Sequence, residues 1–164
     1  MAKRNYWLLK SEGDCYSIDD LKKDKKTSWS GIRNYQARNF MRDQMHVDDL
    51  CLFYHSSSEP TGVYGIAKVV SGPKSDATAL DKKDDHFDPK STKENPIWMC
   101  VDIAFVKKLE RPVALYELKA DANLRGMPVL ERGNRLSVQP VSEKHFNYIV
   151  RVLGKVNLIG RDSA

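Results

Sequence analysis

Short apolar runs alternate with polar, turn-rich stretches along the chain. Four runs rich in aromatic and β-branched residues predict strands at 6–10, 50–55, 62–70 and 97–109. The sequence RLSVQPV predicts a further extended segment at 135–141. The turn-forming residues of SSSEPTG, between the second and third runs, predict that these two strands pair as a hairpin.

Helix-capping residues precede the segments with helical spacing. Ser17 predicts the start of a short helix, and Asn34 predicts a helix that runs to Met45. Shorter helical signals lie at 115–119 and, after a serine cap, at 142–153. The order of elements lacks a regular βαβ repeat. It therefore predicts a mixed α/β fold, in which a strongly curved sheet or small β-barrel is flanked by helices.

The least regular part of the sequence is the polar segment 71–96, which contains three prolines. So long an excursion from a compact chain is usually either functional or mobile. Two interpretations stay open, a lid over a binding site and a plain surface loop.

The composition is typical of a soluble globular protein and predicts one domain over residues 1–164. The chain has 41% hydrophobic and 30% charged residues and a net charge of +5. Both ends are basic and the middle is acidic, which suits a polyanion on one face, although an ordinary basic protein can share this pattern. The apolar run at 6–9 is too short for a signal peptide, and no run reaches the length of a membrane span. We therefore expect a cytoplasmic or nucleoid-associated monomer with no membrane partner.

The sequence contains no motif for a cofactor, a metal or a catalytic centre. Its three cysteines lie far apart without a C-x-x-C pair, and its four histidines do not cluster. Glycine-rich nucleotide loops, the G-x-S-x-G nucleophile motif and the H-E-x-x-H zinc motif are absent. We expect no cofactor, no metal and no enzymatic activity. Cys51 and Cys100 lie in apolar runs and are expected to be buried.

Segment 28–42, SWSGIRNYQARNFMR, has the highest density of side chains suited to a nucleic acid. Its aromatic and amide side chains could stack on a base or bond to its edge: Trp29, Asn34, Tyr35, Gln36 and Asn39. Arg33 and Arg38 could contact phosphates, although a solvated helix face explains either arginine as well. Trp29 has two interpretations, a stacking platform in a loop and a plug at the end of the core.

Further candidates lie at the ends of predicted strands. His55 and Ser56 end one strand, where polar side chains either face a cavity or form hydrogen bonds within the chain. Trp98 begins another strand, where packing in the core is the usual role. Alternate residues of the extended segment 135–141 are expected to share one polar face: Arg135, Ser137 and Gln139. A cation, a hydroxyl and an amide on one face suit an anion or a nucleobase, and solvent exposure is the alternative.

Seven segments, in order and spacing, resemble the EVE domain family: YWLLKSE, SWSGIRNYQARNFMR, DLCLFYHSS, GVYGIAKVV, FDPKS, PIWMCVDI and RLSVQPV. The likeness extends from Tyr6 to Ile149. It implies a PUA-like fold, a small curved β-barrel flanked by helices. The family is similar to the YTH domains, which hold a methylated adenine in an aromatic cage. EVE domains are thought to bind modified bases in nucleic acid, with modified cytosine in DNA as the leading candidate.

Carried over by position, the resemblance implies a base pocket built from separate segments: Lys10, Ser11, Trp29, Asn34 to Asn39, His55, Ser56, Trp98, Arg135, Ser137 and Gln139. The family commonly has proline where this chain has Gly13. Glycine leaves the backbone free where proline would fix it, so the edge of the pocket is expected to be looser here.

These features predict a non-enzymatic module that binds nucleic acid, with DNA favoured over RNA, and holds a flipped, modified base in an aromatic and amide-lined pocket; the resemblance implies that this base is a modified cytosine. Stacking on an indole ring and a few hydrogen bonds would offset the cost of unstacking the base. Two alternatives stay open. One is a sensor of a free nucleoside or another small aromatic molecule, and the other is an enzyme acting on nucleic acid with His55 as general base near Ser56 or Ser137.

Overall fold

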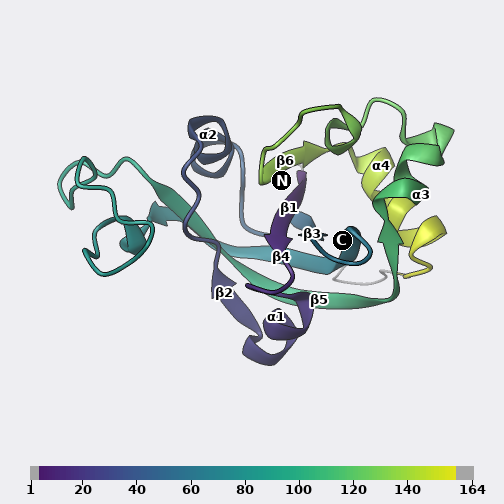
Figure 1. Ribbon diagram of the computed structural model, residues 1–164, viewed down its shortest axis with the longest axis horizontal. Coiled ribbons are helices and arrows are strands. Elements are labelled where there is room, and N and C mark those ends of the chain that lie inside the picture. The colour runs from purple at the N-terminus through teal and green to yellow at the C-terminus, as the bar shows by residue number, and fades with distance from the viewer. Residues whose placement is uncertain (1–3, 158–164) are drawn as a thin grey trace.

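The computed structural model describes residues 4–157, in which six strands form one curved sheet with helices packed around it (Figure 1). The strands are β1 (Tyr6–Glu12), β2 (Lys26–Ser28), β3 (Leu50–Ser56), β4 (Gly62–Ser75), β5 (Met99–Ala114) and β6 (Val138–Val141). Their order is β2-β5-β4-β3-β1-β6, so β2 and β6 form two open edges. The predicted mixed α/β class, with a curved sheet and flanking helices, is confirmed, and the sheet is unclosed. The predicted domain limits, 1 and 164, lie outside the described residues.

Strand pairing places the ends of β1 and β3 side by side. β3 and β4 are antiparallel and form the predicted hairpin. β1 and β3 are parallel, because the chain returns between them through two helices and β2. Ser11, near the end of β1, is therefore the register partner of His55, near the end of β3.

Alternate residues of the central strands supply two hydrophobic clusters, one on each face of the sheet. Leu9 of β1 and Phe53 of β3 belong to the cluster that contacts the first two helices, and we call this side the α2 face. Leu8 and Tyr54 belong to the cluster that contacts the last helices, and we call this side the α4 face. Neighbouring residues of one strand thus point to opposite faces of the sheet. The predicted site residues on the strands are divided between the two faces in the same way.

Four α-helices lie where the sequence predicts them: α1 (Ile18–Asp24), α2 (Tyr35–Asp43), α3 (Leu115–Ala120) and α4 (Glu143–Asn147). The predicted caps are confirmed, since Ser17, Asn34 and Ser142 each accept a hydrogen bond from a backbone N–H in the first turn. The last helix changes its bonding pattern after α4 and continues as a π-helix over Tyr148–Leu153. Within residues 4–157, no helix has the length and apolar character needed to cross a bilayer.

Strand limits differ from the predictions at several strands, among them β5, which spans Met99–Ala114 where 97–109 was predicted. β2 is too short and polar to give a sequence signal, and pairing with β5 stabilises it. β4 continues to Ser75, so the irregular segment begins later than predicted and includes a 3-10 turn at Ala77–Ala79. β6 begins only at Val138, so residues 135–137 precede the strand. Cys51 and Cys100 are buried, as predicted.

Candidate functional site

The start of α2 carries a stack of aromatic and cationic side chains. Tyr35 is 57% exposed, and its ring stacks on that of Trp98 with the centroids 4.8 Å apart. The guanidinium of Arg33 lies 5.3 Å from the centroid of Trp98, and that of Arg38 lies 4.8 Å from the centroid of Tyr35. We call these four side chains the aromatic stack. Tyr35 is its exposed member.

All five N–H groups of Arg33 bond within the chain. Nη1 donates to Oδ2 of Asp76 at 3.0 Å, and Nη2 and Nε donate to the backbone oxygen of His86 at 2.7 and 2.9 Å. The remaining bonds go to the backbone oxygen of Ile32 and to Oγ1 of Thr78. Arg33 therefore anchors the segment after β4 to the start of α2. Its phosphate role stays a prediction, and a phosphate would have to displace these bonds.

Asp76 is the buried acceptor of this network. Burial tends to raise its pKa, but hydrogen bonds from Thr78, from the backbone N–H of Gly31 and from Arg33 outweigh burial and hold the pKa below its ordinary value. The backbone N–H of Asp76 also donates to the carbonyl of Trp98 at 2.9 Å. The ionised Asp76 thus connects the loop before α2 to the aromatic stack.

The other polar groups of the stack are also paired. Nε1 of Trp98 donates to Oδ2 of Asp88 at 2.7 Å. Arg38 donates to the carbonyl of Ile97 at 3.1 Å and twice to Oδ1 of Asn39, at 3.0 and 2.8 Å. The amide oxygen of Asn39 therefore positions Arg38. The indole of Trp98 is 4% exposed; Asp88 accepts its N–H, and Tyr35 and Arg33 lie against its ring.

Trp29 follows β2 on the α2 face and is 7% exposed. Its ring meets Phe53 edge to face, with the centroids 5.5 Å apart. Its Nε1 is the one fully buried side-chain nitrogen or oxygen within residues 4–157 that has no hydrogen-bond partner. An unpaired buried donor costs about 1–3 kcal/mol, and in native proteins such a group commonly serves a ligand or a water. Trp29 is therefore part of the core and also offers an unused donor.

His55 is held tightly at the end of β3. Its Nε2 accepts the backbone N–H of Ile18 at 3.1 Å, and its ring stacks on Tyr64 with the centroids 3.9 Å apart. Burial lowers the pKa of His55, so the ring is neutral, and we assign its proton to Nδ1 because Nε2 accepts. The hydroxyl of Ser11 donates to the carbonyl of Tyr16 at 2.6 Å.

Ser56 and Gly13 border the same strand ends. The hydroxyl of Ser56 donates to the carbonyl of Ser11 at 3.4 Å. A Cβ atom added at Gly13 would lie 2.6 Å from Oγ of Ser58 and 3.2 Å from Nδ1 of His55. The glycine that departs from the family pattern therefore lets this loop approach His55 closely.

Lys10 and Gln139 lie on the α4 face, away from Trp29. Nζ of Lys10 lies 5.8 Å from the centroid of Tyr54. Gln139 is 1% exposed, and its Nε2 donates to the carbonyl of Leu136 at 2.7 Å and to Oδ1 of Asn134 at 3.2 Å.

The predicted polar face of 135–141 does not form, because the strand starts only at Val138. Gln139 is buried there, Arg135 is exposed, and Ser137 accepts the backbone N–H of Lys10 through its carbonyl at 2.8 Å.

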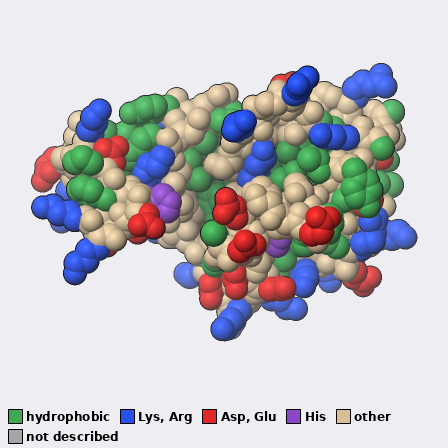
Figure 2. Space-filling model, viewed as in Figure 1, with side chains coloured by type: hydrophobic (Ala, Val, Ile, Leu, Met, Phe, Trp, Pro, Cys, Tyr) green, Lys and Arg blue, Asp and Glu red, His purple; other side chains and the backbone are tan. Residues whose placement is uncertain are grey.

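The loop 131–134 separates two grooves. The larger, about 500 Å³, is the Lys10 groove, and it is lined by Lys10, Tyr54, Leu115, Lys119 and residues 129–134. The smaller, about 380 Å³, is the Gln36 groove, and it is lined by Gln36 of α2 and by residues 131–136. Lys and Arg side chains gather along the upper edge of the molecule in Figure 2, over the segment that links α3 to β6. The two grooves share the loop 131–134, and each has further cations of its own, Lys10 and Lys119 in the Lys10 groove and Arg135 in the Gln36 groove.

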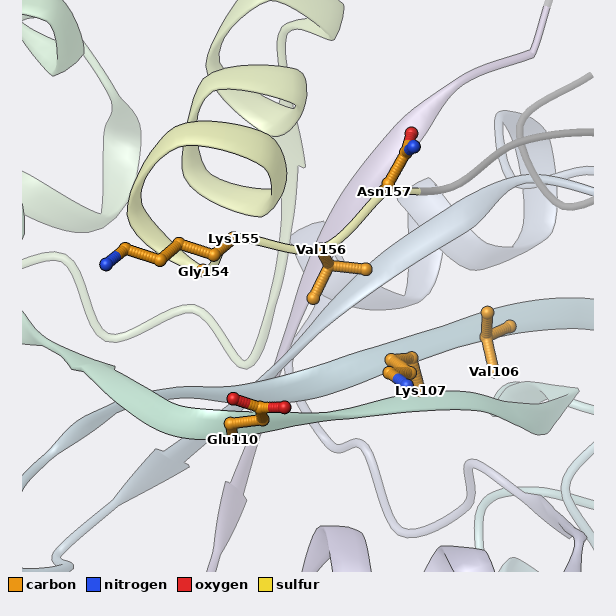
Figure 3. A pocket seen from close by; sticks show the side chains of 7 residues that line it. All are labelled: Val106, Lys107, Glu110, Gly154, Lys155, Val156 and Asn157. Atoms are coloured by element: carbon orange, nitrogen blue, oxygen red, sulfur yellow. The ribbon is translucent and has the colours of Figure 1, made fainter.

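A third depression, about 300 Å³, lies between β5 and the segment after the π-helix (Figure 3). Val106, Lys107 and Glu110 line one side, and residues 154–157 line the other. Figure 3 shows the side chain of Lys155 extending away from Val156. None of the residues predicted to form the site lines this depression.

The structure distributes the predicted site residues over four places. The ends of β1 and β3 and the adjoining α2 face hold Ser11, Trp29, His55 and Ser56. The aromatic stack and its supports hold Arg33, Asn34, Tyr35, Arg38, Asn39 and Trp98. The Gln36 groove holds Gln36 and Arg135, and the α4 face holds Lys10, Ser137 and Gln139. The assignment of these residues to a single base pocket stays a prediction.

Sequence reasoning missed four residues that organise the site: Asp76, Asp88, Arg132 and Asn134. The two aspartates lie in the irregular segment, where acidic residues are common; Asp88 belongs to FDPKS, one of the segments that resemble the family, whereas nothing singles out Asp76. The only signal for the other two was the turn-like sequence ERGN.

Comparisons with protein families, protein sequences and solved structures identify related proteins. The model of the EVE domain family matches residues 5–152. Thymocyte nuclear protein 1 of Rattus norvegicus is 39% identical over 165 residues, which span 89% of this chain and 72% of that protein. A hypothetical protein from Leishmania major has a similar structure, with a TM-score of 0.88, 47% identity and coverage of 93% and 96% of the two chains. Human THYN1 protein, in a crystal structure with 5-methylcytosine-containing DNA, has a TM-score of 0.85 and 35% identity, and the match covers 93% of this chain and 99% of that chain.

Proposed function

This chain belongs to the EVE domain family, and we propose that it is a non-enzymatic module that binds DNA carrying a modified cytosine. The proposal draws on the human relative, whose structure contains 5-methylcytosine DNA and matches this chain over nearly its full length. The modified base would leave the duplex and enter the domain at the ends of β1 and β3. Phosphates would lie along the two grooves, whose linings carry the cations Lys10, Lys119, Arg132 and Arg135.

The unpaired N–H of Trp29 carries this proposal. Cytosine offers acceptors at its ring nitrogen and carbonyl oxygen, and a base that accepts the indole N–H would remove the cost of an unpaired buried donor. Nε1 is fully covered, so entry requires the side chains over Trp29 to move aside. Burial of one methyl group contributes about 0.8 kcal/mol, or about fourfold in affinity. Sharper selectivity for the methyl group would need close apolar walls such as the ring of Phe53.

The geometry of His55 favours a binding module over an enzyme. A general base needs a free lone pair within reach of the proton it takes. Nε2 of His55 already accepts the N–H of Ile18, and the other ring nitrogen carries the proton. Catalysis through His55 would therefore require breaking the bond that holds the start of α1.

The proposal is tested by fluorescence anisotropy with duplexes that differ at one base: cytosine, 5-methylcytosine or 5-hydroxymethylcytosine. The protein should prefer one of the modified duplexes. Trp29→Phe keeps a ring but removes the N–H, so affinity for the preferred duplex should fall about fivefold, the worth of one buried hydrogen bond. Trp98→Phe is the matched control, because it removes an N–H that Asp88 already accepts, and it should keep the affinity for the preferred duplex.

Equal affinity of the wild-type protein for all three duplexes would contradict the proposed function. An unchanged affinity of Trp29→Phe for the preferred duplex would remove Trp29 from the site. If free 5-methyl-2′-deoxycytidine competes with the duplex and binds with the same affinity, the alternative of a sensor for a free nucleoside is favoured.

A further inference from the structure

The Lys10 groove lies on the α4 face, on the opposite side of the sheet from Trp29. Its floor includes Tyr54, and its walls come from the start and end of α3 and from the loop 129–134. The loop 131–134 is also the wall of the Gln36 groove. A strand of nucleic acid that follows the Gln36 groove therefore needs only to cross this loop to reach the Lys10 groove.

Lys10 is a half-buried cation without a counter-ion. Its Nζ donates to the carbonyl of Asn134 at 3.2 Å, and no carboxylate within residues 4–157 forms an ion pair with it. Desolvation lowers the pKa of Lys10, with no acidic neighbour to raise it. An ammonium group that is partly desolvated and has no counter-ion gains energy from an anion that enters the groove.

Other donors surround Lys10. Tyr54, which is 3% exposed, lines the groove and carries a hydroxyl that can donate a hydrogen bond. Lys119 and Arg132 also line the groove and form no ion pair in the described part of the chain, and Glu131 is the one acidic residue of the lining. Three cations against one carboxylate give the groove a positive potential.

We propose that the Lys10 groove is a phosphate-binding site, which takes a backbone phosphate of the same DNA strand that presents its base to the α2 face. Lys10 and Tyr54 contact the phosphate oxygens at the floor, and Lys119 and Arg132 add charge at the rim. The DNA source of the phosphate rests on the proposed function, whereas the phosphate chemistry of the groove does not. Phosphate contacts position a nucleic acid without reading its sequence.

The first test measures affinity for duplexes with and without 5-methylcytosine at several salt concentrations. Lys10→Met should weaken both duplexes about tenfold, lower the slope of log Kd against log salt by about 1, and leave the preference between duplexes unchanged. Lys22→Met, an exposed lysine of α1, is the matched control and should change neither affinity nor slope. The double variant Lys119→Gln with Arg132→Gln breaks no internal ion pair, and it should show the same pattern if Lys10→Met folds poorly.

The second test titrates inorganic phosphate and follows the backbone amide resonances of Lys10 and Asn134 by NMR. Saturable shifts in the wild-type protein that disappear in Lys10→Met support the site. If phosphate binds in this way but Lys10→Met leaves DNA affinity unchanged, the groove takes the phosphate of a free ligand, and the DNA source is overturned. Unchanged DNA affinity together with no saturable phosphate shift overturns the whole proposal. If phosphate binds but the protein shows no preference for modified DNA, the proposed function is contradicted, whereas the assignment of the Lys10 groove as a phosphate site is retained.

Discussion

Trp29 and Trp98 are buried to similar extents, at 7% and 4% exposure, but the chain holds them differently. Trp98 donates its N–H to Asp88, stacks on Tyr35 and lies against the guanidinium of Arg33. Trp29 packs on Phe53, and its N–H has no partner within residues 4–157. Two residues of the same type and depth therefore differ in whether their polar group is satisfied.

This difference distinguishes a tryptophan that can bond to a ligand from one that supports the structure, which the degree of burial alone does not do. A ligand that bonded to the indole of Trp98 would have to replace an existing charged hydrogen bond, which is worth more than a neutral one. A ligand that bonded to Trp29 would supply a bond that the folded chain lacks. We therefore propose recognition of the base for Trp29 and a supporting role for Trp98, which fixes the exposed Tyr35.

The largest effect is expected from Asp76→Ala, which tests whether the region of Trp98 is held by its polar network. Asp76 is 1% exposed and accepts from Arg33, Gly31 and Thr78. Removal of one member of a buried charged pair should cost about 3 kcal/mol of the free energy of unfolding, measured by urea denaturation. Asp85→Ala, at an exposed position in the same segment, is the control and should have almost no effect. An equal stability of the two variants would show that the network does not hold this region.

A smaller effect is expected when each tryptophan is replaced by phenylalanine and the melting temperatures are compared. Trp98→Phe breaks the bond to Asp88 and should lower the Tm by about 5 °C. Trp29→Phe also loses ring volume, but it removes an unsatisfied donor, so its Tm should fall by less. A larger loss for Trp29→Phe than for Trp98→Phe would reverse the comparison and assign Trp29 a purely structural role.

Local signals explain what the sequence predicts correctly. Continuous apolar runs predict the central strands, and Ser17, Asn34 and Ser142 mark helix starts, because caps act on backbone groups within a few residues. Partners distant in sequence give no such signal: Arg33 and Asp76 meet only because β4 and α2 pack together, 43 positions apart. Gln139 was predicted on an open polar face, but the strand starts late and Asn134 and Leu136 enclose it.

The smallest effect is expected from mild acid, which should disturb the two regions at different pH values. Burial lowers the pKa of His55, so its neutral form stabilises the fold fully above about pH 6.5, and this contribution is lost as the pH falls through the lower folded pKa. Asp76 and Asp88 also have lowered pKa values, and their contribution is complete above about pH 3.9 and is lost only below it. The ring of Trp29 contacts Phe53, which in turn contacts His55. As the pH is lowered in an NMR titration, the indole N–H resonance of Trp29 should therefore shift at a higher pH than that of Trp98. His55→Gln can still accept from Ile18 without titrating, so the earlier step should disappear in this variant. A single step below pH 4 for both resonances would show that the two regions respond as one.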